Sequence, residues 1–470
     1  MLHPSGDVVD VILDGVDVSF SPMYGLSGDP STADPPSYGY PVMVNETYFS
    51  IGLEEWVSRM YITRDTEAIW NAIDAGGTII MHPGVYNWNA RTVYSKIVGS
   101  TELFQYTSMM QYDRDFVPWG TPLDYHLKGA TTGKDGPLVK VVCDLFIHIG
   151  ADPAMITHPI HILENIHFDN SEWEEHCISM GGFSFNTILG WVGLADLTIN
   201  KCKFTGGGVT LHSFGSATFT GNVMDQTLYG VQVTPPADAD FLIANNKIHS
   251  AGAGIWCEQL VSFWYDSRPK TIEITGNEIA WSDLAGVGIF LSDASIIAQH
   301  NTVTSVPALL GNYFGYYAGI GTWGCLQGGL IKNNHIVGGE GLENFYGISL
   351  GGTNASTIQS NNVSGMWFVP ISLGWELDFG TGPSNSNVLV GNNLNNVVPI
   401  SGAHYFLDWC DYNVIRGGGI GGQSITVVDN GVGNLATGLD HQIGQLSMEE
   451  PYTSMKHAMS EKFSALKEGP

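Results

Sequence analysis

The stretch Ile272–Ser282, IEITGNEIAWS, carries a phrase that recurs along the chain. Each copy has a short β-branched run, then an asparagine, one free residue and an apolar residue. The asparagines align at seven positions that lie 24 to 33 residues apart: Asn222, Asn246, Asn277, Asn301, Asn334, Asn361 and Asn392. A repeat of this length is typical of a solenoid in which every repeat adds one coil.

A second alternating run follows each phrase after a glycine or a proline, as in GVTLHS from Gly208, GIFLSD from Gly288 and PISLGW from Pro370. Val, Ile and Leu alternate with polar or small residues, which indicates a strand with one buried face. We therefore predict a parallel β-helix, with each asparagine at a structural corner where its amide can bond to the next coil. Cys202 occupies the same place one coil earlier. A two-sheet sandwich is the alternative, but it does not predict one asparagine phrase per repeat.

The segment DTEAIWNAIDAGGTIIMHPGVYNW, residues 65–88, predicts a helix over Thr66–Ala75 followed by a strand and a turn. It resembles the opening of the pectin-lyase-like right-handed parallel β-helix superfamily, written roughly D-T-x-A-I-x-x-A-I and G-G-T-[IV]-x-x-P-x-G-x-Y. Pro83 stands directly before Gly84, one residue closer than in that pattern. The resemblance covers about residues 60 to 430 and implies the fold, with an N-terminal capping helix. Because the superfamily holds hydrolases, lyases, epimerases, esterases, tailspikes and adhesins, it does not imply one activity.

Three regions are expected: an irregular N-terminal segment over residues 1–60, the β-helix over 61–445, and a C-terminal helical tail over 446–470. The tail has apolar residues at helical spacing, which predicts an amphipathic helix. It would close the open end of the solenoid or contact another subunit. Superfamily members are often monomers or trimers, and both states stay open. The apolar residues of the tail are Tyr452, Met455, Met459, Phe463 and Leu466.

The chain has 18 Lys and Arg against 46 Asp and Glu, a formal net charge of -28. Such a surface repels nucleic acid and anionic membranes. No apolar run approaches the roughly 18 residues of a membrane span. A secreted, extracellular protein is favoured, although the first residues show no signal peptide. Buried free thiols are expected for the six dispersed cysteines: Cys143, Cys177, Cys202, Cys257, Cys325 and Cys410.

The outward positions of the second alternating runs predict a binding face. They place three aromatic residues on one side of the solenoid, beside polar groups that could bind a polysaccharide or an oligosaccharide. The alternative is that long loops cover these aromatics as a second core. The expected substrate-binding residues are His212, Gln232, Trp256, Phe290 and Trp323.

Carboxylates near this face suggest glycoside hydrolysis, which needs two carboxyl groups flanking the scissile bond. Glu258 and Asp293, one coil apart, are the first candidate pair. Glu376 and Asp378 are the second, because residues i and i+2 of a strand share a face. Asp408 is a further carboxylate near this face.

Charge also favours a neutral glycan. Residues 271–450 contain two basic residues, Lys332 and Arg416, against 14 carboxylates. A polyuronate lyase usually requires a basic residue as well as neutralisation of the sugar carboxylate. No cofactor is predicted, although calcium bound by the excess acids would partly rescue a lyase. Motifs resembling those of polygalacturonases (N-T-D, D-D, G-H-G, R-I-K) or pectate lyases (R-x-P-x-x-R) are absent, so no catalytic residue follows from the resemblance.

A histidine-rich stretch, residues 148–177, raises the question of a metal site. Alternation predicts that His161 and His167 point outward near Asp169, but the spacing matches no compact ligand motif, and no metal is predicted. Three functions remain: a glycosidase or transglycosidase, a non-enzymatic glycan-binding or structural protein such as an adhesin or tailspike, and a lyase or epimerase. Insertions at residues 259–270 and 306–318 favour the enzyme, because insertions build cleft walls.

Overall fold

The computed structural model describes residue 2 and residues 42–51, 53–88, 90–108, 123–142, 147–149, 159–169, 186–190, 196–206, 208–211, 216–233, 240–258, 271–281, 287–292, 296–306, 316–323, 328–339, 344–374, 383–408, 410–418, 425–437 and 440–443. The chain divides into two compact units, Met1–Leu242 and Ile243–Pro470. The predicted C-terminal helix lies outside the described residues.

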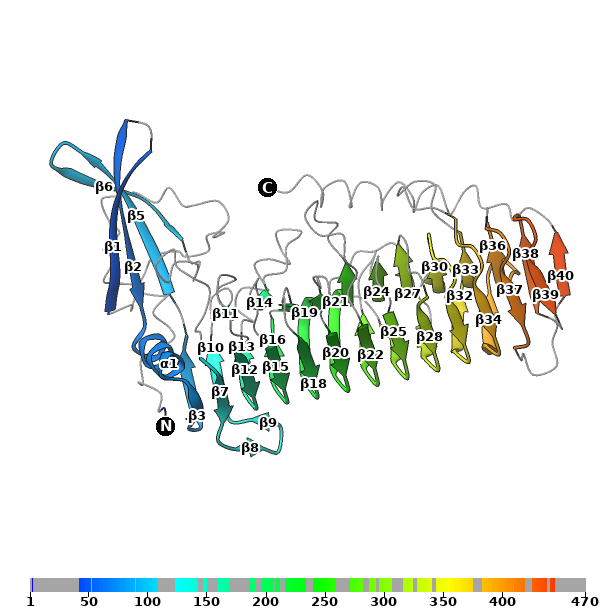
Figure 1. The fold of residues 1–470 in the computed structure, drawn as a ribbon, viewed down its shortest axis with the longest axis horizontal. Helices are drawn as coiled ribbons and strands as arrows, with labels where there is room; N and C mark the ends of the chain where they lie inside the picture. Colours follow the sequence, from blue (N-terminus) through cyan, green and yellow to red (C-terminus); the bar gives the residue numbers. More distant parts are fainter. Residues whose placement is uncertain are drawn as a thin grey trace. The chain divides into compact units, whose positions relative to one another are not determined.

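The first unit opens with a four-stranded antiparallel sheet in the order β1-β2-β5-β6 (Figure 1). The prediction of an irregular segment over residues 1–60 is therefore wrong for β1 and for most of β2. Polar residues interrupt the alternation of β1, so its strand character depends on the antiparallel pairing with β2. The four strands are β1 (Val42–Ile51), β2 (Glu54–Ile62), β5 (Ala90–Val98) and β6 (Thr101–Ser108).

Helix α1 (Arg64–Ala75) forms where the sequence predicts it. The Thr63 side chain caps it by accepting a hydrogen bond from the Thr66 amide at 3.1 Å. Ile69 and Ile73 form its buried face. The Asp65 carboxylate accepts a hydrogen bond from the Asn87 amide at 2.8 Å, which fastens the helix to the end of β4 (Gly84–Asn87). Its role as a cap stays a prediction.

The rest of the first unit is made of parallel coils. The first ladder joins β3 (Gly77–Met81), β7 (Tyr125–Gly129), β12 (Ile160–Glu164), β15 (Asp196–Asn200) and β18 (Ala217–Thr220). The second joins β4, β10 (Val139–Val142), β13 (His167–Asp169), β16 (Lys203–Thr205) and the start of β19 (Val223–Val233). The third joins β11 (Ile147–Ile149), β14 (Asn186–Gly190), β17 (Gly208–Leu211) and the end of β19. A small hairpin pairs β8 (Thr132–Gly133) with β9 (Gly136–Pro137). The boundary between the units falls in β20 (Asp240–Ala244).

The second unit repeats the same three ladders. The first contains β22 (Thr271–Thr275), β25 (Ile296–Gln299), β28 (Leu330–Lys332), β31 (Thr357–Gln359), β34 (Val388–Val390), β37 (Val414–Arg416) and β39 (Leu435–Thr437). The second contains the start of β21 (Lys247–Glu258), β23 (Glu278–Trp281), β26 (Thr302–Ser305), β29 (His335–Val337), β32 (Asn362–Trp367) and β35 (Asn393–Pro399). The third contains the end of β21, β24 (Val287–Ser292), β27 (Tyr316–Trp323), β30 (Asn344–Leu350), β33 (Val369–Leu373), β36 (Tyr405–Leu407), β38 (Thr426–Asp429) and β40 (Asp440–Ile443).

Identical residues stack in register through the core of the second unit. Adjacent strands of the third ladder place aliphatic side chains one above another, and all of them are buried. This regular stacking of parallel strands defines the predicted parallel β-helix. The stack runs through Ile255, Ile289, Ile320, Ile348 and Ile371.

The repeated asparagines form a buried ladder, as predicted. The Nδ2 of each donates to the Oδ1 of the next at 2.9–3.0 Å, from Asn246 through Asn277, Asn301, Asn334 and Asn361 to Asn392. In the first unit, the Cys202 amide donates to the Asn222 Oδ1 at 2.8 Å, so Cys202 occupies an equivalent place. The left-handed backbone conformation falls instead on the residue just before each asparagine: Asn245, Gly276, His300, Asn333, Ser360 and Gly391.

Three of the six cysteines lie among the described residues, and all three are buried free thiols, as predicted. Burial raises the pKa of Cys202 to about 12. It also raises the pKa of Cys257 and that of Cys410. Cys143, Cys177 and Cys325 lie outside the described residues.

Candidate functional site

The predicted binding face of the second unit lies on the third ladder. Trp256 of β21 pairs in register with Phe290 of β24, and their ring centroids are 4.1 Å apart with an interplanar angle of 27°. Trp256 is partly exposed, whereas Phe290 is buried, with 1% of its surface accessible to solvent. Phe290 therefore does not line an open groove, and its burial matches the alternative prediction of a second, outer core.

The third aromatic residue belongs to a neighbouring row. Gly321 of β27 pairs with Phe290, whereas Trp323 pairs with Ser292, which in turn pairs with Glu258 of β21. Glu258 and Trp323 thus lie in one row, two residues along the strands from the row of Trp256 and Phe290. Strand alternation predicts the same face of the sheet for both rows.

The candidate carboxylates are not brought together among the described residues. Asp293, Glu376 and Asp378 lie outside them. Asp408 directly follows β36 and lies in the row of Glu258. The interstrand hydrogen bonds place Gly351, Gly374 and Asp408 in this row, each on the next strand after Trp323. Five strand spacings separate Glu258 from Asp408, about 24 Å, whereas an inverting pair of carboxyl groups is about 6.5–9.5 Å apart. These two acids therefore cannot act on one glycosidic bond.

Asp408 has an environment that favours its protonated form. Partial burial raises the pKa of its carboxyl above the ordinary value, although a hydrogen bond from the Asn430 Nδ2 at 3.2 Å opposes the rise. Sequence reasoning placed Asp408 near the face but gave it no role. Its raised pKa suits a proton donor, and Asp411 and Asp429 lie near enough that all three acids raise the pKa of the Cys410 thiol.

In the first unit, Gln232 lies on β19 in register with Thr210 of β17, and its side chain is partly exposed. This agrees with the outward position expected for it. His212 follows β17 and lies outside the described residues. The insertion at residues 259–270 also lies outside them. The insertion expected at residues 306–318 lies mostly outside them too, and its last three residues are the start of β27 (Tyr316–Trp323).

The prediction that His161 points outward is wrong. It is fully buried and its ring stacks on Tyr125 with centroids 4.4 Å apart, whereas Ile160 is exposed. The reason is that β12 has apolar residues at both parities, and Leu163 shares the core side with His161. A partly buried polar cluster at the end of β12 was missed: Glu164 accepts from His126 at 2.9 Å and from Lys128 at 3.1 Å.

His167 does alternate with the buried Phe168, as predicted. Its Nε2 lies 3.0 Å from the Thr205 hydroxyl. Asp169, two residues on, forms an ion pair with Lys140 at 2.5 Å. Burial lowers the pKa of His167 to about 4; Asp169 opposes this shift, and Lys203 and Lys140 add to it. Within the part of the chain that the structure describes, no three His, Cys, Asp or Glu side chains could hold a metal ion together.

The two basic residues of residues 271–450 lie away from the aromatic rows. Lys332 and Arg416 belong to the first ladder, in one row with Gln359 and Val390 between them. The rows of Trp256 and Glu258 belong to the third ladder. Neither basic side chain can therefore serve as a base on the candidate face.

The chain matches no protein-family model and no curated protein. Among solved structures it is similar to one described as "Structure of the Streptococcus pneumoniae surface protein and adhesin PfbA". That match has 14% sequence identity and a TM-score of 0.32, and it covers 81% of this chain and 96% of the other. No helix in the described part of the chain has the length and hydropathy needed to span a membrane.

Proposed function

We propose that the chain is a glycan-binding protein of the parallel β-helix class, which holds a neutral oligosaccharide against the aromatic and acidic rows of the second unit. The observation that carries the proposal is the stacking of the partly exposed Trp256 on the buried Phe290. The buried ring fixes the orientation of the tryptophan before any ligand arrives. A preorganised aromatic surface loses little conformational entropy when a sugar ring binds to it.

The surroundings of Trp256 favour a neutral sugar. Glu258 lies two residues along the same strand, and Trp323 continues its row two coils away. Lys332 and Arg416 lie on another ladder, so neither of them can compensate the charge of a polyuronate bound beside Glu258. A carboxylate can instead accept hydrogen bonds from sugar hydroxyl groups.

A glycoside hydrolase is the second candidate, because Glu258 shares the strand face of Trp256. Its partner would have to come from residues near the end of β24, where Asp293 is the expected one. A lyase is a weaker candidate, since neither of the two basic residues of residues 271–450 lies on the third ladder.

Glycan-array screening followed by calorimetry tests the proposal. We expect Trp256→Ala to weaken binding of a neutral oligosaccharide at least tenfold, and Trp256→Phe to weaken it less because a ring remains. A matched control is Val398→Ala, an exposed apolar residue on the second ladder. The absence of glycan binding by the wild type, or equal affinity of wild type and Trp256→Ala, would overturn the proposal.

A reducing-end assay separates the two candidates. If the wild type binds a glycan and releases no new reducing ends, the binding function stands alone. If it does release them, and Glu258→Gln abolishes release while retaining affinity, the protein is a hydrolase. Absorbance from unsaturated uronates would instead indicate a lyase.

A further inference from the structure

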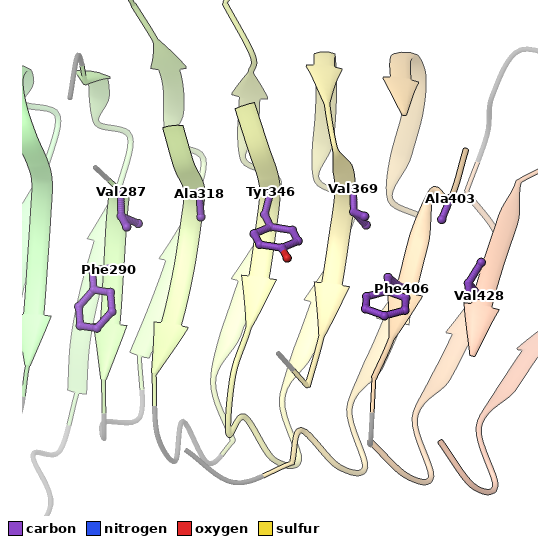
Figure 2. Packing of buried hydrophobic residues seen from close by; sticks show 8 residues of the cluster. All are labelled: Val287, Phe290, Ala318, Tyr346, Val369, Ala403, Phe406 and Val428. Carbon is purple, nitrogen blue, oxygen red and sulfur yellow. The ribbon is translucent and has the colours of Figure 1, made fainter. Parts of the chain in front are cut away.

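The outer side of the third ladder carries a row of apolar residues along six strands of the second unit, which we term the outer row. Its members are packed together on one side of the strands (Figure 2). They are Val287, Phe290, Ala318, Tyr346, Val369, Ala403, Phe406 and Val428.

A bend in each strand directs these residues outward. A Cβ at Gly288 would lie 2.1 Å from the Val303 Cγ1, so position 288 faces the core and Val287 faces away from it. Gly319 and Gly347 show the same relation to Ile336 and Val363. The outer row is therefore not part of the solenoid core.

In the register row that joins Phe290 to Phe406, the intervening strands have only small residues. The register places Gly321, Ser349 and Ser372 there, one on each intervening strand. Ser349 and Ser372 are both completely buried. Small residues on an outer face cannot bury themselves, so a bulky element must lie over them. An element that runs lengthwise would cover all three positions at once, whereas each loop of the solenoid belongs to a single coil.

We infer that the C-terminal segment, residues 447–466, is that element, and that its residues 451–466 dock as a helix along the outer row of its own chain, with Pro451 at the first helical position. Its five apolar residues span 14 positions, about 21 Å of helix. The outer row spans five strand spacings, about 24 Å. At about 100° per residue the five side chains fall within an arc of about 80°, which is one face of a helix.

The path of the chain sets the direction of docking. The last described strand, β40, pairs with β38, and its Gln442 lies in register with Val428 at one end of the outer row. Eight residues then separate Ile443 from Tyr452, enough for the chain to turn back. Tyr452 should consequently lie near β36 and β38, and Phe463 near β24 and β27. This inference does not depend on the proposed function.

Photo-crosslinking in the full-length protein tests the docking directly. With p-benzoylphenylalanine in place of Phe463, we expect adducts on peptides from β24 to β30. In place of Tyr452, we expect adducts on β36 and β38. The matched control places the same group at Ser464, which lies about 100° around the helix from Phe463 and should give no adducts with these strands. Adducts on another ladder, or in the reverse order, would overturn the inference.

Mixing isotopically labelled and unlabelled chains distinguishes the source of the segment. Adducts within one chain support the inference, whereas adducts that combine both isotopes assign the outer row to a second copy and overturn it. Hydrogen exchange gives a second readout. Phe463→Asp should accelerate exchange of the amides of residues 447–466 at least tenfold, and Ser464→Asp should not. Equal exchange in the two variants would refute the docking, and circular dichroism confirms that both retain the β-helix.

Discussion

Removing one amide from the asparagine ladder should destabilise its coil severely. Asn361 is completely buried and makes four side-chain hydrogen bonds. Its Nδ2 donates to the Asn392 Oδ1 at 3.0 Å and to the Ile331 carbonyl at 2.9 Å. Its Oδ1 accepts from the backbone amide of Asn334 at 3.0 Å and from the Asn334 Nδ2 at 2.9 Å.

The size of the effect follows from these bonds. Each buried hydrogen bond contributes about 1 kcal/mol net, so Asn361→Ala should cost about 4 kcal/mol. The Asn334 Nδ2 keeps the Ala298 carbonyl as an acceptor, but the backbone N–H of Asn334 loses the Asn361 Oδ1. In a solenoid the loss is felt by the neighbouring coils, because each coil contacts only the next.

Asn362→Ala is the matched control, because Asn362 is the next residue along the chain and its side chain is half-buried on the outer face. Its Nδ2 lies 2.9 Å from the His335 Nδ1, and losing that contact should cost about 1 kcal/mol or less. Hydrogen exchange followed by mass spectrometry should therefore show about 10³-fold faster exchange around β29 and β32 for Asn361→Ala, since about 1.4 kcal/mol corresponds to tenfold. An acceleration of less than tenfold, or one equal to that of the control, would refute the ladder as a source of stability.

Gly288→Ala should destabilise its coil by about 3 kcal/mol through overpacking, because the new Cβ would meet the core. At Gly402 the new Cβ would face open space, so Gly402→Ala should cost about 1 kcal/mol for its left-handed backbone alone. Thermal unfolding of the two variants compares these costs. His167 has a folded-state pKa of about 4, below its ordinary value of 6.5, so protonation favours the unfolded chain. Stability should be constant above about pH 6.5 and fall toward pH 4, and His167→Gln should flatten this slope in denaturant titrations. The thiols of Cys202 and Cys257 should remain unreactive toward a disulfide reagent at pH 8 until the protein unfolds, because burial raises the pKa of both.

The fold could be predicted because its signal is local and repeated. Each asparagine lies between a left-handed turn residue and the strand that follows, and the ladder requires the same residue once per coil. A second ladder was missed. It runs from Asn387 to Asn413 at 3.0 Å and on to Asn434 at 3.1 Å, at another corner of the coil. Its three asparagines share one signal, an apolar pair directly after the asparagine, but three copies are too few to stand out.

The candidate site could be predicted only in part. Alternation correctly placed Trp256 and Phe290 on one face, because side-chain direction is a property of the strand itself. Alternation does not report exposure: Phe290 shares the face of Trp256 and is still buried, with the Trp256 ring stacked on it. The limit of alternation is clearest at His161. Strand β12 has apolar residues at both odd and even positions, so the sequence alone does not show which set faces the core.

The outer row also restricts where a ligand can bind. A polymer lying lengthwise over the third ladder would have to replace whatever buries Ser349 and Ser372. It would then meet mainly Val, Ala and Phe side chains, with few hydrogen-bonding groups beyond the hydroxyls of Tyr346, Ser349 and Ser372. Sugars need such groups as well as rings, so the trough is a poor site for a glycan and a good one for an apolar helix. The row of Glu258 and Trp323 lies two residues farther along the same strands. A glycan that binds this unit should therefore contact the rim beside Trp256, and it should leave the buried trough undisturbed.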